Sequence, residues 1–201
     1  MNELIDYIQK EIHITYNKKY SKRFINDKFI PIIHYICSSK SRKFLFGGSQ
    51  GIGKSSLIAI ISKVIEKFYN KRILLLSLDN YYLTKRERLL LSKKVHQLLI
   101  TRGVPGTHNV KKLLENINHF NKKKYPINIP VFDKLIDDRC GFNKIVTKKC
   151  DLLFLEGWCC GSSQITKEYL YKNINNLEKI NDKKYQWRNF YNNKLKLEYK
   201  K

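Results

Sequence analysis

The segment GSQGIGKS, residues 48–55, has the spacing G-x-x-x-x-G-K-[ST] that is typical of phosphate-binding loops. Glycines let the backbone curl so that successive N–H groups point at phosphate oxygens, and a following helix adds the positive end of its dipole. Lys54 would reach the terminal phosphates of ATP, and the Ser55 hydroxyl would bind Mg²⁺. The alternative is a glycine-rich turn that only joins a strand to a helix. The residues expected to bind the cofactor are Gly48, Ser49, Gln50, Gly51, Ile52, Gly53, Lys54, Ser55 and Ser56.

Two carboxylates stand at the ends of apolar runs. Asp79 follows residues 73–78, and Glu156 follows residues 151–155. Asp79 is expected to accept the proton of an attacking hydroxyl, with a helix-capping role as the alternative. Glu156 is expected to hold Mg²⁺, directly or through water, with an ion pair to a lysine as the alternative. Lys54, Asp79 and Glu156 are therefore the predicted catalytic residues.

The elements that must position these residues alternate along the chain. Short apolar runs predict strands, and apolar residues three and four positions apart predict helices. The expected strands are 43–47, 73–78 and 151–156, and the expected helices are 3–13, 22–38 with an interruption at Pro31, 55–69, 84–101, 109–122 and the polar tail 165–201. This order implies an α/β fold of the P-loop NTPase type, a parallel sheet between two helical layers with ligands at the carboxyl ends of the strands.

We expect one domain over residues 1–201, with 1–40 as a helical extension and 165–201 as a Lys-rich tail. The formal charge of +23 allows a nucleic-acid partner, but the lysines are spread along the whole chain and no nucleic-acid motif is recognised. We therefore do not expect one. No apolar run approaches 18 residues, the N-terminus lacks a signal-like pattern, and the five cysteines form no C-x-x-C pair. The expected location is the cytoplasm, without a membrane partner.

Five further segments follow the phosphate loop in the sequence. They are LDNYYLT at 78–84, RGVPGTHN at 102–109, PVFDK at 130–134, DR at 138–139 and EGW at 156–158. With the phosphate loop, these segments resemble the D-glycerate 3-kinase family, which is related to phosphoribulokinase, uridine kinase and bacterial pantothenate kinase. The resemblance covers about residues 40–190.

The resemblance implies transfer of a phosphoryl group from ATP to D-glycerate, with Asp79 as the base. It implies that the acceptor site consists of Asp79, Tyr82, Arg102, His108, Lys134 and Arg139, of which the last four form a cationic wall. Such a wall suits an acceptor that carries a carboxylate. Arg102 could equally be a surface residue, and His108 could belong to a turn or cap the next helix.

The chain departs from the family pattern at Asn80, Asn109, Val131 and a shortened loop at 135–137. The family also continues into a further strand and helix, so we expect the strand before the phosphate loop to lie at an exposed sheet edge. Arg188 is the candidate for a lid arginine over the transferring phosphate. The functional alternatives are a related kinase for pantothenate, uridine or a sugar phosphate, or a non-catalytic nucleotide-binding protein. The sequence makes no prediction of the oligomeric state.

Overall fold

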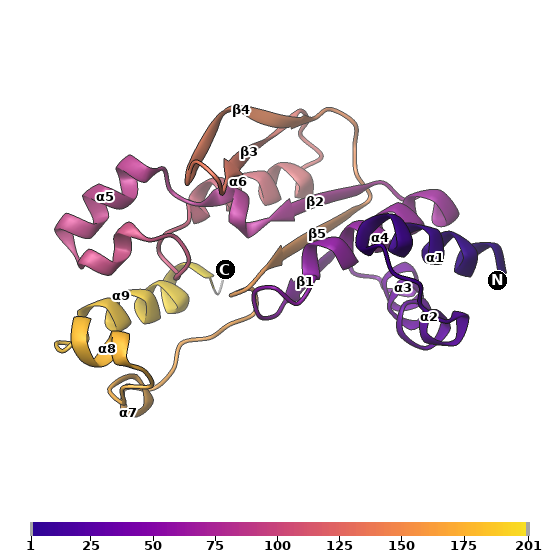
Figure 1. Cartoon of the computed structure of the whole chain (residues 1–201). Helices are drawn as coiled ribbons and strands as arrows, with labels where there is room; N and C mark the ends of the chain where they lie inside the picture. Colours follow the sequence, from indigo (N-terminus) through magenta and orange to yellow (C-terminus); the bar gives the residue numbers. More distant parts are fainter. Residues whose placement is uncertain (1, 200–201) are drawn as a thin grey trace.

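The computed structural model describes residues 2–199 and contains a central parallel sheet with helices on both faces (Figure 1). The strands of this sheet are β1 (Lys43–Gly47), β5 (Leu152–Gly157) and β2 (Ile73–Ser77), in that spatial order. Phe44 of β1 and Leu75 of β2 lie opposite Phe154 of β5, so the carboxyl ends of all three strands meet at one edge. The expected three-layer α/β/α fold is confirmed.

One face of the sheet is covered by helices from the N-terminal third of the chain. The helices on this face are α1 (Asn2–Tyr16), α2 (Lys22–Lys28), α3 (Ile30–Ser38) and α4 (Lys54–Tyr69). Their isoleucines pack against Leu152 and Phe154, the side chains of β5 that point to this face. The expected interruption of 22–38 at Pro31 is confirmed, because α2 ends at Lys28 and Pro31 lies in the first turn of α3.

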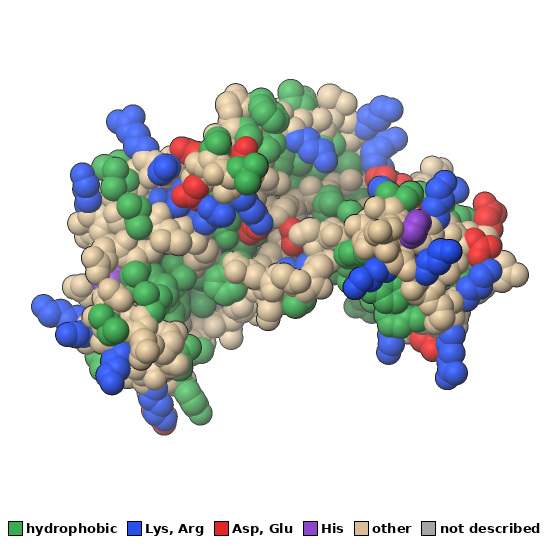
Figure 2. Space-filling model, viewed as in Figure 1, with side chains coloured by type: hydrophobic (Ala, Val, Ile, Leu, Met, Phe, Trp, Pro, Cys, Tyr) green, Lys and Arg blue, Asp and Glu red, His purple; other side chains and the backbone are tan. Residues whose placement is uncertain are grey.

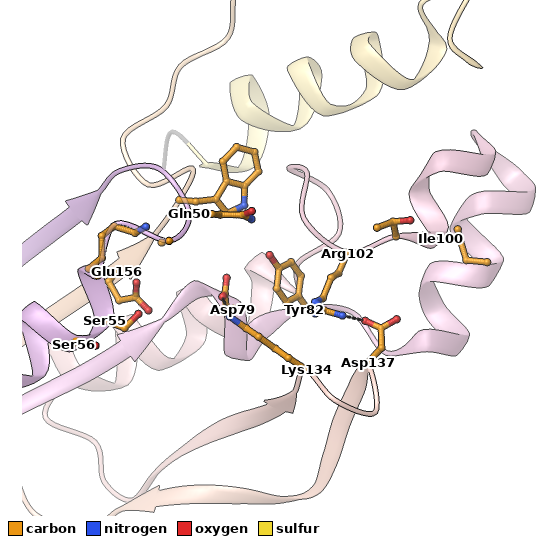
Figure 3. Close-up of a pocket in the computed structure, with 16 residues that line it drawn as sticks. Gln50, Ser55, Ser56, Asp79, Tyr82, Ile100, Arg102, Lys134, Asp137 and Glu156 are labelled. Atoms are coloured by element: carbon orange, nitrogen blue, oxygen red, sulfur yellow. Dashed lines mark hydrogen bonds and ion pairs between the residues drawn. The ribbon is translucent and has the colours of Figure 1, made fainter. Parts of the chain in front are cut away.

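The opposite face packs against α6 (Val110–Asn121) and a hairpin of β3 (Ile127–Asp133) and β4 (Asp138–Val146). Leu153 of β5 and Leu74 and Leu76 of β2 point to this side. The sequence did not predict the hairpin, since a proline such as Pro130 is unusual inside a strand and most side chains of the second strand are exposed. The hairpin places Lys134 and Asp137 across from the phosphate loop, at the carboxyl ends of the parallel strands (Figure 3).

The segment predicted as one helix over 84–101 consists of α5 (Lys85–Lys94) and a 3₁₀ turn (Gln97–Ile100). Thr84 and Glu87 form a capping box that starts α5. His96 is extended and its ring accepts a hydrogen bond from the Leu98 N–H, which separates the two elements. The break turns the chain back toward Arg102.

The tail forms short helices and not one long one. They are α7 (Lys167–Leu170), α8 (Asn176–Asn181), α9 (Gln186–Lys194) and a π-helical turn (Leu195–Tyr199). Arg188 of α9 is 1% exposed and donates to the Asp182 carboxylate at 2.9 Å and to the Leu170 carbonyl at 3.1 Å. The expectation that Arg188 is a lid arginine was therefore wrong, because its guanidinium is buried in the packing of the tail.

β1 lies at the edge of the described sheet, as expected. Leu45 on this strand is 54% exposed beside an apolar groove of about 370 Å³ between α6 and the sheet. Within residues 2–199 no helix is long and apolar enough to cross a membrane. On the face in Figure 2, lysine and arginine side chains are spread over the whole width of the molecule and do not gather over one element.

Candidate active site

The predicted phosphate loop connects β1 to α4. Gly48, Gly51 and Gly53 all have positive backbone φ angles, of 155°, 77° and 83°, which residues other than glycine rarely adopt. The curled path therefore depends on glycines at these positions. Gly53 precedes the first turn of α4 and no side chain caps that turn. Uncapped N–H groups at the positive end of a 16-residue helix fit a phosphate group.

The loop borders a cavity of about 810 Å³ (Figure 3). Of the predicted nucleotide-binding residues, the cavity wall includes Gln50, Gly51, Gly53, Lys54, Ser55 and Ser56. Gly48, Ser49 and Ile52 belong to the loop but not to this wall, and the Ile52 side chain is 63% exposed. The Lys54 ammonium donates to the Ser49 carbonyl at 2.7 Å, so it lies folded over the loop.

Asp79 and Glu156 line the same cavity as Ser55. Asp79 lies in the 3₁₀ turn Leu78–Tyr81 that follows β2, and α5 has Thr84 as its own cap, so Asp79 is not a helix N-cap. Glu156 is the penultimate residue of β5, is 5% exposed, and forms no ion pair with any described residue. Parallel strands bring the two carboxylates together because Ser77, two residues before Asp79, lies opposite Glu156.

These residues fit a magnesium ion held partly by a nucleotide. Among residues 2–199 there is no group of three His, Cys, Asp or Glu side chains that could hold a metal ion alone. The Ser55 hydroxyl and Glu156 carboxylate are oxygen ligands of the kind that Mg²⁺ prefers. Magnesium usually retains water and binds one or two protein oxygens together with substrate phosphates. The two side chains therefore suit Mg²⁺ that arrives with ATP.

The wall facing the loop carries Tyr82, Arg102 and Lys134. The Lys134 ammonium lies 2.6 Å from a carboxylate oxygen of Asp79, and both side chains point into the cavity (Figure 3). Lys134 comes from the tip of the β3–β4 hairpin, 55 positions after Asp79 in the chain. Folding of the hairpin over the sheet edge thus joins the predicted base to a cation.

Asp137 is a residue of this wall that the sequence did not predict. Its carboxylate forms an ion pair with Arg102 and a second one with Arg88 at 2.9 Å. Burial alone would raise the pKa of Asp137, but hydrogen bonds from the two guanidinium groups outweigh it, and the pKa lies below its usual value. The partners lie 35 and 49 positions away in the chain, so no local pattern signals the cluster.

Two residues of the expected cationic wall do not line the cavity. His108 is 4% exposed, stacks on Tyr82 with 4.3 Å between ring centroids, and its Nδ1 lies 2.6 Å from the Tyr199 hydroxyl. Burial lowers the pKa of His108 to about 3, against the opposing charge of Asp79, so the ring is neutral at pH 7. The expectation of a cationic His108 was therefore wrong.

Arg139 lies behind Tyr82 and donates from Nε to the Tyr82 carbonyl at 2.8 Å. His108 and Arg139 both support Tyr82, which does line the cavity. Trp158 also lines it, and its indole N–H donates to the Gly103 carbonyl at 3.0 Å. This bond ties the end of β5 to the loop that carries Arg102.

A glycine loop between the edge strand and the next helix, with carboxylates at the ends of the neighbouring parallel strands, defines the P-loop class of nucleotide-binding folds.

No protein-family profile matches the chain. Over 153 residues, 69% of its length, the chain is 36% identical to the Saccharomyces cerevisiae protein named "Probable ATP-dependent kinase TDA10", of which 52% is covered. It is 30% identical over 153 residues to the Schizosaccharomyces pombe protein named "Uncharacterized kinase mug58", of which 55% is covered. The pantothenate kinase of Bacillus subtilis is 28% identical over 117 residues, 57% of this chain and 35% of that protein.

Two solved structures share the fold. The structure of the YGR205w protein has a TM-score of 0.61 and 28% identity, over 87% of this chain and 64% of that one. The D-glycerate 3-kinase of Cryptococcus neoformans has a TM-score of 0.59 and 21% identity, over 97% and 67%. The chain spans about half the length of the first two relatives. Sequence and fold together show that it belongs to the P-loop kinase family.

Proposed function

We propose that the chain is an ATP-dependent small-molecule kinase that transfers the γ-phosphoryl group of ATP to a hydroxyl of D-glycerate. The observation that supports this most directly is the pairing of Asp79 with Lys134 at 2.6 Å in the cavity that the phosphate loop borders. A base next to a cation suits an acceptor that has both a hydroxyl and a carboxylate. The kinase relatives and the D-glycerate 3-kinase fold support the same reaction class.

On the nucleotide side, the loop N–H groups and the start of α4 would bind the phosphates, and Lys54 would exchange the Ser49 carbonyl for a phosphate oxygen. Ser55 and Glu156 would hold Mg²⁺, which offsets the negative charge of the phosphates when bound. Glu156 is buried near the end of β5, and its backbone pairs with β1 on one side and β2 on the other, so the sheet fixes the point from which its side chain extends.

On the acceptor side, Lys134 forms an ion pair with Asp79. An acceptor carboxylate would give Lys134 a new partner and leave Asp79 free to take the hydroxyl proton. The hydroxyl oxygen then bonds to the γ-phosphorus as the bond to the β-phosphate oxygen breaks, and ADP leaves. Tyr82 and Arg102 complete the wall around the acceptor.

The test is ADP release from ATP and Mg²⁺ with and without D-glycerate, using Lys54→Ala as the inactive variant. Lys93→Ala, an exposed lysine of α5, is the matched control. We expect release that depends on D-glycerate, disappears in Lys54→Ala and persists in Lys93→Ala. If ATP binds and D-glycerate has no effect, pantothenate, uridine and sugar phosphates are tried next. ATP binding without turnover on any of these acceptors would favour a non-catalytic nucleotide-binding protein, and the absence of ATP binding would contradict the proposal altogether.

A further inference from the structure

The charged side chains that line the large cavity balance one another. Three are cations, namely Lys54, Arg102 and Lys134, and three are anions, namely Asp79, Asp137 and Glu156. The chain as a whole has a formal charge of +23, so this balance is not a reflection of composition. The cavity is therefore locally neutral within a strongly basic chain.

On the acceptor side each cation already has a carboxylate partner. Lys134 pairs with Asp79 and Arg102 pairs with Asp137 (Figure 3). An acceptor can draw Lys134 away from its carboxylate partner more easily than Arg102. Lys134 is 60% exposed, whereas Arg102 is 29% exposed and also lies over the Phe132 ring at 5.6 Å. Lys134 is thus the cation that an incoming anion can recruit.

The fold anchors Asp137 in this position. Its second carboxylate oxygen accepts from Arg88, which is fully buried and also donates to the carbonyls of Leu83 and Ile100. Asp137 has a left-handed backbone, with φ of 56°, at the end of the short loop between β3 and β4. Since Arg88 cannot turn to solvent, it holds Asp137 in place, and Asp137 in turn holds Arg102.

We propose that Asp137 determines the charge specificity of the acceptor site, holding Arg102 on the cavity wall and offsetting its charge so that acceptors with at most one negative charge are preferred. This inference rests on the proposed kinase function. A second negative charge on the acceptor meets no unpaired cation on this wall. It lies close to the Asp137 and Asp79 carboxylates and to the nucleotide phosphates, and all of these repel it.

The test compares glycerol, D-glycerate and malate, which are similar in size, carry hydroxyls and have charges of zero, minus one and minus two at neutral pH. For each compound kcat/KM is measured by ADP release and the dissociation constant by calorimetry. Wild-type protein is expected to prefer D-glycerate. Asp137→Asn should raise the ratio of malate to D-glycerate by about tenfold or more in both measurements, because one nearby negative charge has been removed.

Asp27→Asn is the matched control, since Asp27 also pairs with an arginine but lies on α2, away from the cavity. It should leave the ratio unchanged. Arg102→Gln changes the charge of the wall in the opposite direction and should lower the ratio of malate to D-glycerate severalfold. This variant tests the inference if circular dichroism shows that Asp137→Asn does not fold. An unchanged ratio in folded Asp137→Asn, or a higher ratio in Arg102→Gln, would overturn the inference. If wild-type protein phosphorylates none of the compounds, the proposed function fails, while the dissociation constants still test the charge preference.

Discussion

Replacing Arg188 with methionine is expected to destabilise the C-terminal helices by about 3–5 kcal/mol. The side chain is 1% exposed and its guanidinium serves two buried carboxylates, Asp182 at 0% and Glu178 at 5% exposure. It also donates to the Leu170 carbonyl at 3.1 Å and to the Asn173 side chain at 2.9 Å. Methionine fills most of the volume but leaves both carboxylates without a cation. Removing one partner of a buried ion pair typically costs about 3–5 kcal/mol of folding stability, which is the source of the expected value.

The assay is urea unfolding, followed by circular dichroism and by tryptophan fluorescence, with the free energy extrapolated to water. Trp187 is a local reporter, because its backbone N–H donates to the Asp182 carboxylate at 2.9 Å. Arg23→Met is the control, since that side chain is 92% exposed and makes one long ion pair at 3.7 Å, and it should change stability by less than about 0.5 kcal/mol. If Arg188→Met lowers the free energy of unfolding by less than about 1 kcal/mol, the loss is smaller than the cost of breaking a buried ion pair, and the reasoning is refuted. Lost ADP release with unchanged stability would instead restore the lid hypothesis.

Three further predictions concern the loop, the buried histidine and the metal ligand. Gly53→Ala places an alanine in a left-handed conformation, at φ 83°, directly before α4. The substitution should reduce the free energy of unfolding by about 1–2 kcal/mol and weaken ATP binding. An unchanged thermal midpoint together with an unchanged ATP affinity would argue against this loop conformation. The pKa of His108 lies near 3 when folded and near 6.5 when unfolded, so its contribution to stability is complete above pH 6.5 and declines as pH falls, by up to about 1.4 kcal/mol per unit. Urea midpoints at pH 7, 5.5 and 4 should show a smaller decline in His108→Gln, and identical pH profiles would contradict a buried neutral ring. Glu156→Gln should raise the Mg²⁺ concentration for half-maximal ADP release by about tenfold or more, whereas an unchanged requirement would remove Glu156 from the metal site.

Local patterns predicted the sheet well because its strands are continuous apolar runs. Residues 43–47 and 151–156 agree with β1 and β5 to within one residue, and 73–78 exceeds β2 by one. β2 and β5 have no exposed residue, so they need no polar alternation and are easily recognised, whereas β1 is an edge strand that was recognised from its apolar residues although Leu45 is exposed. The β3–β4 hairpin lacked that signal, because β4 is mostly exposed and its pairing with β3 depends on contacts distant in the chain.

The tail is helical, as its sequence predicted, but the sequence did not predict where its helices begin and end. The chain divides into α7, α8 and α9 around a buried arginine. Asn175 caps α8, and its side chain accepts from the Glu178 N–H. Sequence alone could not distinguish Arg188 from an exposed arginine, since its burial depends on Asp182 and Glu178 folding around it.

The sequence by itself determined the phosphate loop and the two strand-end carboxylates, because glycine spacing and apolar runs are local and the carboxyl ends of parallel strands meet at one sheet edge. Only the tertiary structure decided which cations face them. Lys134 reaches Asp79 and Arg102 reaches Asp137 through the fold of the hairpin, while the same fold buries His108 as a neutral ring behind Tyr82. Ion pairing and burial depend on neighbours distant in the chain, and these neighbours set the charge of each group.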